Sequence, residues 1–153
     1  MRIREMRAID LHAACRIDPE WTIEAWSPYV NYDAVDGECY SARVLEHCGR
    51  IIGCMAYRWT SDLFHVHRLV IAPMCQRRGN GRYMLAFLKA FLRPGRQQRI
   101  LATVDEYDVD GQLFLRGCGF RCVRSEHGFL RMEFGLSEPE AFRPVNRIAK
   151  VRA

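Results

Sequence analysis

The sequence lacks several features that would place it in a specialised class of protein. None of its apolar runs approaches the ~20 residues that a membrane-spanning helix needs, and residues 1–5 (MRIRE) lack the apolar segment of a signal peptide. It also contains no internal repeat and no low-complexity tract. The 153 residues therefore predict a single cytoplasmic domain that does not enter a membrane and is long enough to bury a core.

Paired cysteine motifs are missing as well. The chain has 7 cysteines, an odd number, and none of them forms a C-x-x-C pair. A chain of this length does not need disulfides, so we expect reduced thiols, most of them packed as small apolar residues. His65 and His67 form an H-x-H pattern, but no third ligand stands nearby at a diagnostic spacing, and we predict no metal site.

The charge balance is moderately basic, with a formal net charge of +5. Such a balance is compatible with nucleic-acid binding, but an enzyme that binds a polyanionic cofactor has the same use for arginine. The sequence contains no recognised nucleic-acid-binding motif, so nucleic acid is not an expected partner.

The most informative stretch is residues 64–92 (FHVHRLVIAPMCQRRGNGRYMLAFLKAFL). Its first part is rich in β-branched and aromatic residues, which favours a buried strand, and Pro73 ends that strand by removing a backbone donor. From Gly81 onward, apolar residues recur at three- and four-residue steps, which predicts one apolar helix face; these residues are Met84, Leu85, Leu88, Phe91 and Leu92.

The turn between strand and helix is typical of an anion-binding site. Gly79 and Gly81 stand where the helix starts, and glycine there lets backbone N–H groups approach a ligand closely. The unpaired amides of a helix N-terminus attract phosphates in particular, and Arg77, Arg78 and Arg82 add positive charge around them. The spacing fits neither the dinucleotide fingerprint nor the Gly-Lys-Ser/Thr loop of ATP-binding proteins.

Residues 71–81 (IAPMCQRRGNG) resemble the V-x-P-x-x-Q/R-x-x-G-x-G/A motif of the GNAT superfamily of N-acetyltransferases. Downstream, Gly119-Phe120 resembles the "GF" that closes the last helix of that family. The resemblance implies that the turn amides hold the pyrophosphate of acetyl-coenzyme A and that the strand backbone contacts the acetyl carbonyl and the pantetheine. The cofactor-binding residues would be Leu69, Val70, Ile71, Gln76, Arg77, Arg78, Gly79, Asn80, Gly81 and Arg82.

Patterns elsewhere in the chain agree with this family. Alternation and turn residues predict strands over residues 1–7, 41–47, 51–59, 99–104, 120–124 and 129–134, with further helices over 11–17 and 109–117. Asp10 is a plausible cap for the first helix. The resemblance implies an α/β fold with a mixed sheet of about seven strands, antiparallel at both ends with a parallel splayed pair in the middle, flanked by about four helices. We expect the acetyltransferase domain to span residues 1–136, followed by a basic extension over 137–153 that is either a docked helix or a loose tail.

The segment from Trp21 to Tyr40 is rich in tryptophan and tyrosine among turn residues. In the GNAT fold, this position holds short helices and a loop over the acceptor site. Packing of a loop and lining of a substrate site are equally good interpretations, because tyrosine and tryptophan serve both purposes.

Acetyl transfer to an amine needs a group that accepts the amine's proton, because free amines are mostly charged at neutral pH. His65 and His67 lie two apart on the predicted strand, so their side chains share a face. They occupy the positions of a paired-histidine motif in arylalkylamine N-acetyltransferases, and His65 also matches the glutamate base of histone-acetylating members. The alternative is two histidines that only satisfy neighbouring hydrogen-bonding groups.

Glu106 competes for the same role. Aligned from Gly119-Phe120, it resembles the glutamate base that follows the fifth strand in ribosomal-protein N-terminal acetyltransferases. The alternative role is favourable electrostatics at the start of the next helix, where acidic residues crowd. We order the candidate catalytic residues as His67, then Glu106, then His65.

One position departs from the family pattern. Many members place a tyrosine, the general acid for the departing thiolate, four residues before the glycine of "GF", where this chain has Leu115 preceded by Phe114. Tyr107, Tyr83, Cys118 or water could replace the tyrosine, or the thiolate could leave unassisted, since the pKa of a thiol is only about 8.5.

The resemblance implies direct attack of a primary amine on acetyl-coenzyme A in a ternary complex. The acceptor is a small-molecule amine or a peptide or protein N-terminus, and the sequence does not choose between them. The alternative function is a catalytically weak module that binds acyl-coenzyme A as a sensor or scaffold, and a homodimer is left open.

Overall fold

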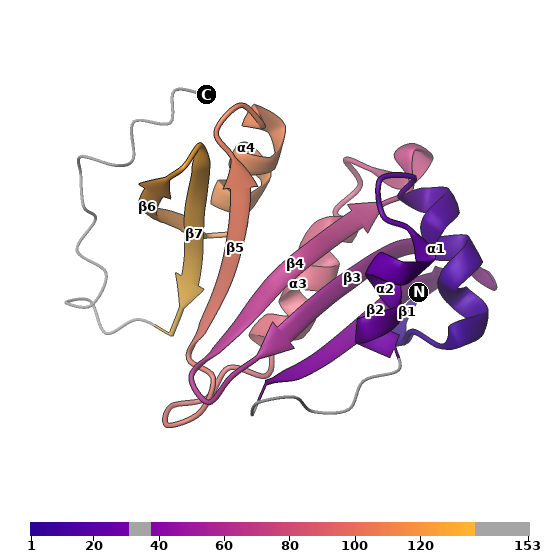
Figure 1. Ribbon diagram of the computed structural model, residues 1–153, viewed down its shortest axis with the longest axis horizontal. Coiled ribbons are helices and arrows are strands. Elements are labelled where there is room, and N and C mark those ends of the chain that lie inside the picture. Colours follow the sequence, from indigo (N-terminus) through magenta and orange to yellow (C-terminus); the bar gives the residue numbers. More distant parts are fainter. Residues whose placement is uncertain (31–37, 137–153) are drawn as a thin grey trace.

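The computed structural model describes residues 1–30 and 38–136. Its centre is a seven-stranded sheet in the order β1-β2-β3-β4-β5-β7-β6 (Figure 1). Among the described residues, no helix has the length and apolar composition that crossing a bilayer requires. The expected basic extension, 137–153, and part of the aromatic segment, 31–37, lie outside the described residues.

The first half of the sheet is an antiparallel meander. It contains β1 (Arg2–Glu5), β2 (Cys39–His47), β3 (Arg50–Trp59) and β4 (Leu63–Ile71). The turn between β2 and β3 uses Cys48 and Gly49, both at positive φ, a conformation that suits a tight hairpin. Side chains alternate between the two faces of these strands, so each face can bury its own apolar set.

The second half of the sheet follows helix α3 (Asn80–Lys89). Strand β5 (Arg99–Asp105) lies parallel to β4, as a helical crossover requires. Helix α4 (Val109–Gly117) and the hairpin of β6 (Arg121–Glu126) and β7 (Phe129–Gly135) complete the sheet. The parallel pairing runs only from Leu63 and Arg99 to Val66 and Ala102. Beyond these residues β4 and β5 diverge, and Figure 1 shows the two halves of the sheet opening like a V.

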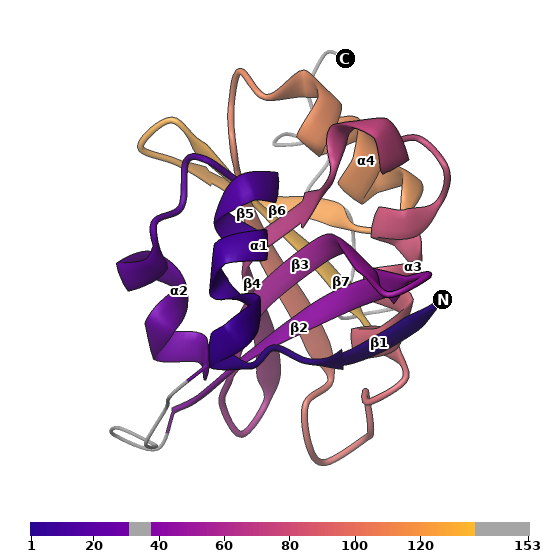
Figure 2. The same cartoon turned by 90° about the vertical axis from the view of Figure 1, so that its right-hand side faces the viewer.

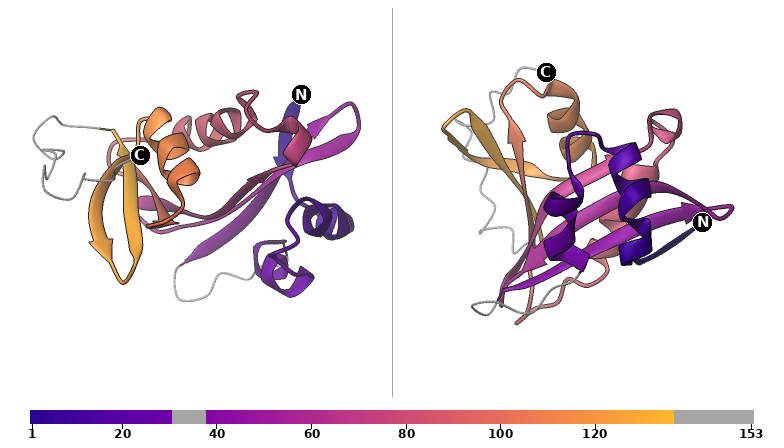
Figure 3. Two further views of the ribbon diagram at one scale, coloured as in Figure 1. Left: turned by 90° about the horizontal axis from the view of Figure 1, so that it is seen from above. Right: turned by 45° about the vertical axis from the view of Figure 1, so that its right-hand side comes forward.

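Helices cover both faces of the sheet. Helices α1 (Leu11–Ile17) and α2 (Ile23–Val30) lie on one face, and α3 and α4 on the other (Figure 3). Figure 2 shows α1 and α2 against the β2–β3 half of the sheet. Two hydrophobic clusters result: Trp26 packs with Cys54 and Ala56 beneath α1 and α2, whereas Leu85 and Leu88 of α3 belong to the larger cluster on the opposite face.

An ion pair fixes the α1–α2 connection to the central strand. Asp18, which is buried, accepts hydrogen bonds of 2.6 Å from Nε and 2.7 Å from Nη2 of Arg68 on β4. Arg68 Nη2 also donates to the exposed Glu20 at 2.9 Å. The bidentate pair is geometrically specific, so it sets where helix α2 begins relative to β4.

The expected fold class is confirmed, because the sheet has seven strands, one parallel pair and four flanking α-helices. Asp10 differs from its expected role. Its side chain does not cap α1 but accepts hydrogen bonds from Arg4 and from the backbone N–H of Arg7. The predicted helix was also too long at its C-terminal end. Helix α3 ends at Lys89, so Phe91 and Leu92 follow the helix instead of lying on it.

We expect Asp18→Ala to lower the free energy of unfolding by about 2 kcal/mol, because it removes the buried member of the Asp18–Arg68 pair. Glu20→Ala is the matched control on the same guanidinium. Its exposed pair is worth at most about 0.5 kcal/mol. Urea unfolding of both variants measures the difference, and equal losses would show that the buried pair does not anchor the α1–α2 connection.

Candidate active site

The turn between β4 and α3 presents a row of unpaired backbone donors. A 3-10 turn (Pro73–Cys75) leads into Arg77 and Gly79, both in the left-handed region at φ 57° and 83°. The side chain of Asn80 donates to the carbonyl of Cys75 at 2.8 Å and fixes the loop from inside. Within the described part of the chain, no acceptor meets the N–H groups of residues 77–82. Such a nest of amides at a helix N-terminus favours an anion.

The gap between β4 and β5 begins beside this turn. Residues 68–71 of β4 pair with β3 on one side, but the described structure pairs none of them with β5 on the other. Phe114 of α4 lies against α3 across the gap, since a Cβ on Gly81 would come within 2.9 Å of its ring. Strand backbone left without a partner can hydrogen-bond an extended ligand instead.

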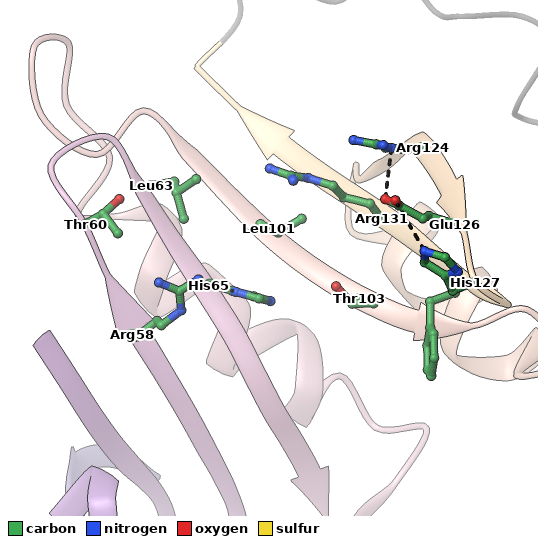
Figure 4. A pocket seen from close by; sticks show the side chains of 11 residues that line it. Arg58, Thr60, Leu63, His65, Leu101, Thr103, Arg124, Glu126, His127 and Arg131 are labelled. Atoms are coloured by element: carbon green, nitrogen blue, oxygen red, sulfur yellow. Dashed lines mark hydrogen bonds and ion pairs between the residues drawn. The ribbon is translucent and has the colours of Figure 1, made fainter. Parts of the chain in front are cut away.

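A cavity of about 420 Å³ lies on the α1–α2 face of the sheet where the two halves diverge (Figure 4). Its wall includes His65 from β4, Leu101 and Thr103 from β5, and side chains of the β6–β7 hairpin. The other lining residues are Arg58, Thr60, Leu63, Arg124, Glu126, His127, Phe129 and Arg131. The cavity is therefore polar and cationic on the hairpin side, with apolar groups at its floor.

One guanidinium holds both histidines of β4. Arg58 of β3 donates from Nε to His67 Nε2 at 3.2 Å and from Nη2 to His65 Nδ1 at 3.3 Å. Because a guanidinium only donates, both imidazole nitrogens facing it must be acceptors. In the neutral rings the proton then lies on His65 Nε2 and on His67 Nδ1, which hydrogen-bonds the hydroxyl of Tyr29. Glu38 pairs with Nη1 of Arg58 and balances its charge.

These surroundings keep both imidazoles neutral. Burial, with His67, Arg58 and Arg131 nearby, lowers the pKa of His65 from 6.5 to about 4. Burial and then Arg58 lower the pKa of His67 as well, while Glu38 opposes that shift. Desolvation and neighbouring cations both disfavour an imidazolium, so the pair carries no charge at neutral pH.

A protein-family model described as "Acetyltransferase (GNAT) domain" matches residues 36–122. The chain belongs to the GNAT acetyltransferase family. No curated protein sequence gives a significant match.

Solved structures of other acetyltransferases share the fold of this GNAT protein. The ribosomal-protein-S18-alanine N-acetyltransferase of Escherichia coli superposes with a TM-score of 0.72 at 17% identity, over 89% of this chain and 94% of that one. The PaiA N-acetyltransferase of Thermoplasma acidophilum, solved with coenzyme A, gives 0.69 at 17% identity over 88% and 98%. An acetyltransferase of Thermus thermophilus gives 0.73 at 20% identity over 88% and 96%. At these identities the likeness establishes the fold alone.

The predicted catalytic residues occupy three different environments in this GNAT domain. His65 lines the cavity, whereas His67 lies behind it in contact with Tyr29 and with the ring of Tyr40. Glu106 is exposed just past the end of β5, and its carboxylate lies near Gly128 in the β6–β7 turn. The two histidines are thus together, with ring centroids 4.4 Å apart, and Glu106 is outside the cavity lining.

The predicted cofactor residues form a continuous path from the gap to the turn. Leu69, Val70 and Ile71 lie in the part of β4 that β5 leaves unpaired. Residues 76–79 form the turn and 80–82 begin the first turn of α3. The Arg82 guanidinium leans along α3 toward α4, since a Cβ on Gly117 would lie 3.5 Å from its Nη2.

The position of the usual general acid carries no titratable group. Leu115 is buried in the core beneath α4. Of the substitutes considered, Cys118 is also buried, which raises its thiol pKa, and Tyr107 is almost fully exposed. Tyr83 is partly exposed on α3.

Three arginines that line the cavity were not predicted from the sequence. Arg58 faces the histidines because the β3–β4 register pairs it directly with His65. The pairing of β3 with β4 shifts register between Ala56 and Tyr57, and the sequence pattern does not predict this irregularity. Arg124 and Arg131 are cross-strand partners on the outer hairpin. Alternation alone could have placed them on one face, but not over the cavity.

The described part of the aromatic segment packs around neighbouring aromatic and histidine rings, and none of its residues is among those that line the cavity. Trp26 is fully buried and packs edge-on against Trp21, with ring centroids 4.9 Å apart. Tyr29 and Tyr40 instead stack around His67. Tyr32 lies outside the described residues.

The His65 environment predicts a specific dependence of stability on pH. The unfolded chain protonates His65 below about 6.5, whereas the folded chain does so only near 4. The unfolded state therefore binds more protons across this window, and stability falls as the pH falls, by up to ~1.4 kcal/mol per pH unit before allowing for the partial exposure of the ring.

His65→Asn should flatten this part of the stability curve, whereas His127→Asn, at an exposed turn position, should leave it unchanged. Urea unfolding between pH 4 and 7 provides the measurement. A wild-type curve that stays flat over this window would contradict the neutral assignment of His65.

Proposed function

We propose that the protein transfers the acetyl group of acetyl-coenzyme A to a primary amine by direct attack in a ternary complex. The single observation that carries this proposal is the row of unpaired amides at residues 77–82, which opens onto the gap between β4 and β5 and from there onto the cavity beside His65. One end of this path suits a pyrophosphate and the other an amine. The acceptor is a small-molecule amine or a peptide or protein N-terminus.

The cofactor would lie along the path in an extended form. Its pyrophosphate would meet the amides of 77–82 with Arg77 and Arg78 beside them, and its pantetheine arm would hydrogen-bond the backbone of Leu69 to Ile71 in place of β5. The thioester would then reach the diverging strands at the cavity. Main-chain N–H groups there suit the oxyanion of the tetrahedral intermediate, a contribution of typically ~3 kcal/mol per donor.

In the reaction, the amine nitrogen forms a bond to the acetyl carbon and the carbon–sulfur bond breaks. The amine loses a proton and the thiolate gains one, so the products are an amide and free coenzyme A. With Leu115 at the usual acid position, we propose that water protonates the thiolate, since the pKa of a thiol is only about 8.5.

The neutral histidine pair shapes the proton transfer. His65 Nε2–H is left as a donor on the cavity side, while the lone pairs facing Arg58 are occupied. We propose that His65 positions the acceptor or a water that carries the amine proton away, while Arg58, held in turn by His67 and Glu38, fixes the direction of its ring. Nearby arginines lower the pKa of a bound ammonium, which increases the neutral, nucleophilic fraction. Glu106 remains the second candidate for the base.

A second function has one observation in its favour. Because Leu115 is buried in the core, no general acid stands at the usual position. A module that binds acyl-coenzyme A without efficient turnover, as a sensor or scaffold, fits this feature. Tight cofactor binding without thiol release on any amine would select this function over the first.

The phosphate site is tested by Gly79→Glu. Gly79 has φ of 83° and open space around its Cβ position, so the substitution adds left-handed strain of roughly 1–2 kcal/mol and a negative charge without a clash. We expect binding of acetyl-coenzyme A to weaken at least about 10-fold, since like charges meet in a nest of amides.

Gly49→Glu is the matched control, because Gly49 has a similar φ of 73°, equally open space, and a place in the β2–β3 turn. Calorimetric titration with acetyl-coenzyme A should show weakened binding in Gly79→Glu and wild-type affinity in Gly49→Glu. If both bind as the wild type does, the phosphate site is elsewhere.

Three single variants separate the positioning role proposed for His65 from a direct base at Glu106. Thiol release from acetyl-coenzyme A with an amine panel should fall about 10-fold or more in His65→Asn. The loss of thiol release should be smaller in His67→Asn, because His67 acts through His65. Glu106→Gln should release thiol at close to the wild-type rate. A large loss only in Glu106→Gln would instead assign the base to Glu106.

A further inference from the structure

The cavity beside His65 is richer in cationic groups than an amine acceptor alone requires. Three arginines line it, Arg58, Arg124 and Arg131, against one carboxylate, Glu126. An amine acceptor is itself a cation before it reacts, and a cationic wall repels it. A wall of this kind suits an acceptor that carries a negative charge next to its amine.

The three arginines differ in how much hydrogen-bonding capacity they have left. Arg58 is committed, because its Nε, Nη1 and Nη2 already meet His67, Glu38 and His65. Arg131 is not, since only its Nε is used, in a 3.3 Å contact with Glu133. Across the described residues, its two Nη groups have no acceptor. A guanidinium with both Nη groups available matches the geometry of a carboxylate or phosphate in a bidentate pair.

Arg131 is also held in a fixed direction. Glu133, which is buried, accepts from Arg131 Nε at 3.3 Å and from Arg99 Nη1 at 3.5 Å, so its charge is shared between two arginines. Figure 4 shows Arg131 reaching from β7 over β5 toward the side where His65 lies, with Arg124 beside it. Arg124 in turn pairs with Glu126 through Nε at 3.1 Å, which leaves its Nη groups to the solvent side of the cavity.

The strand register sets the distance between this group and His65. His65 pairs with Leu101 on β5, and Thr103, two residues farther along β5, pairs with Arg131 on β7. Two strand spacings of roughly 4.8 Å and a rise of two residues put the Cα atoms of His65 and Arg131 roughly 12 Å apart, and because both side chains enter the cavity, roughly 5–8 Å is left between an amine beside His65 and an anion at Arg131. A short aliphatic chain spans that distance.

We propose that the acceptor is a small primary amine that carries a carboxylate or phosphate group a few bonds from the nitrogen, and that Arg131, assisted by Arg124, binds this anion. The inference rests on the proposed acetyl transfer for its account of the amine end. The anion site itself stands on the cavity and the arginines, and is tested without turnover.

The test compares matched acids and neutral analogues by calorimetric titration of the free protein. The pairs are glycine and glycinamide, 3-aminopropanoate and its amide, 4-aminobutanoate and its amide, and 2-aminoethyl phosphate and ethanolamine. Within each pair the amine is kept and only the anion is lost. We expect at least one acid to bind about 10-fold or more tightly than its analogue. The best pair then distinguishes a carboxylate from a phosphate acceptor.

Arg131→Gln should remove this preference, and Arg131→Lys should restore part of it, because lysine keeps the charge but not the fork. Arg116→Gln, on α4 away from the cavity lining, is the control and should bind as the wild type does. Equal binding of acids and neutral analogues, no binding of either, or an equal loss in Arg116→Gln would overturn the proposal. So would a preference for peptides with uncharged N-terminal residues over every small acid.

Failure of this inference is distinct from failure of acetyl transfer. If acids and amides are acetylated at equal rates, the anion site is wrong and the transferase proposal stands. If acids bind at Arg131 but acetyl-coenzyme A yields no thiol with any amine, the anion site stands and the transferase proposal is wrong.

Discussion

The limited pairing of β4 with β5 is the constraint on which the site depends. Four residue pairs, from Leu63 with Arg99 to Val66 with Ala102, join the two halves of the sheet before the strands separate. Everything upstream of that point is closed by ordinary sheet hydrogen bonds. Everything beyond it is open, and the open part contains the amide turn and the unpaired backbone of β4, while the cavity lies beside the last paired residues, His65 and Leu101.

The divergence is maintained by packing on both faces. On one face, α3 and α4 fill the space behind the gap with a single apolar cluster that includes Leu85, Leu88 and Leu115. On the other, Asp18 and Arg68 tie the α1–α2 connection to β4. On the α3–α4 face the cluster spans the open ends of both strands, since it includes Ile71 of β4 and Val104 of β5, whereas the Asp18–Arg68 pair contacts β4 alone. This arrangement explains why a leucine is tolerated where the family often has an acid: the side chain at this position contributes to the core.

The arginines that line the cavity differ in their hydrogen-bond partners. Arg58 uses its donors inside the protein, on two imidazoles and Glu38, and so fixes the tautomers of the histidines. Arg131 uses only its Nε, on Glu133, among the described residues. Two arginines that line the same cavity thus have different roles because of what each one already binds, a distinction that net charge cannot make.

Much of the fold could be predicted from the sequence. Residues 71–81 combine a strand end, a proline and glycines at fixed spacing, and these determine local backbone geometry directly. The histidine pair followed from alternation along one strand. Arg58 and Arg131 could not be predicted, because their positions depend on a bulge in the β3–β4 pairing, where His67 is the extra residue, and on which outer hairpin folds over the cavity. Asp10 was assigned as a helix cap for its local context, but a distant partner, Arg4, determines its role. Local pattern therefore predicts the amide turn better than the cavity beside His65, which is built by long-range register.

The most direct test of the account is a crystal structure of the protein with coenzyme A. We expect the pyrophosphate to accept hydrogen bonds from the amides of residues 77–82, and the thiol to emerge between β4 and β5 on the face where His65 lies. A pyrophosphate bound away from this turn, or a thiol directed to the α3 face of the sheet, would contradict the account.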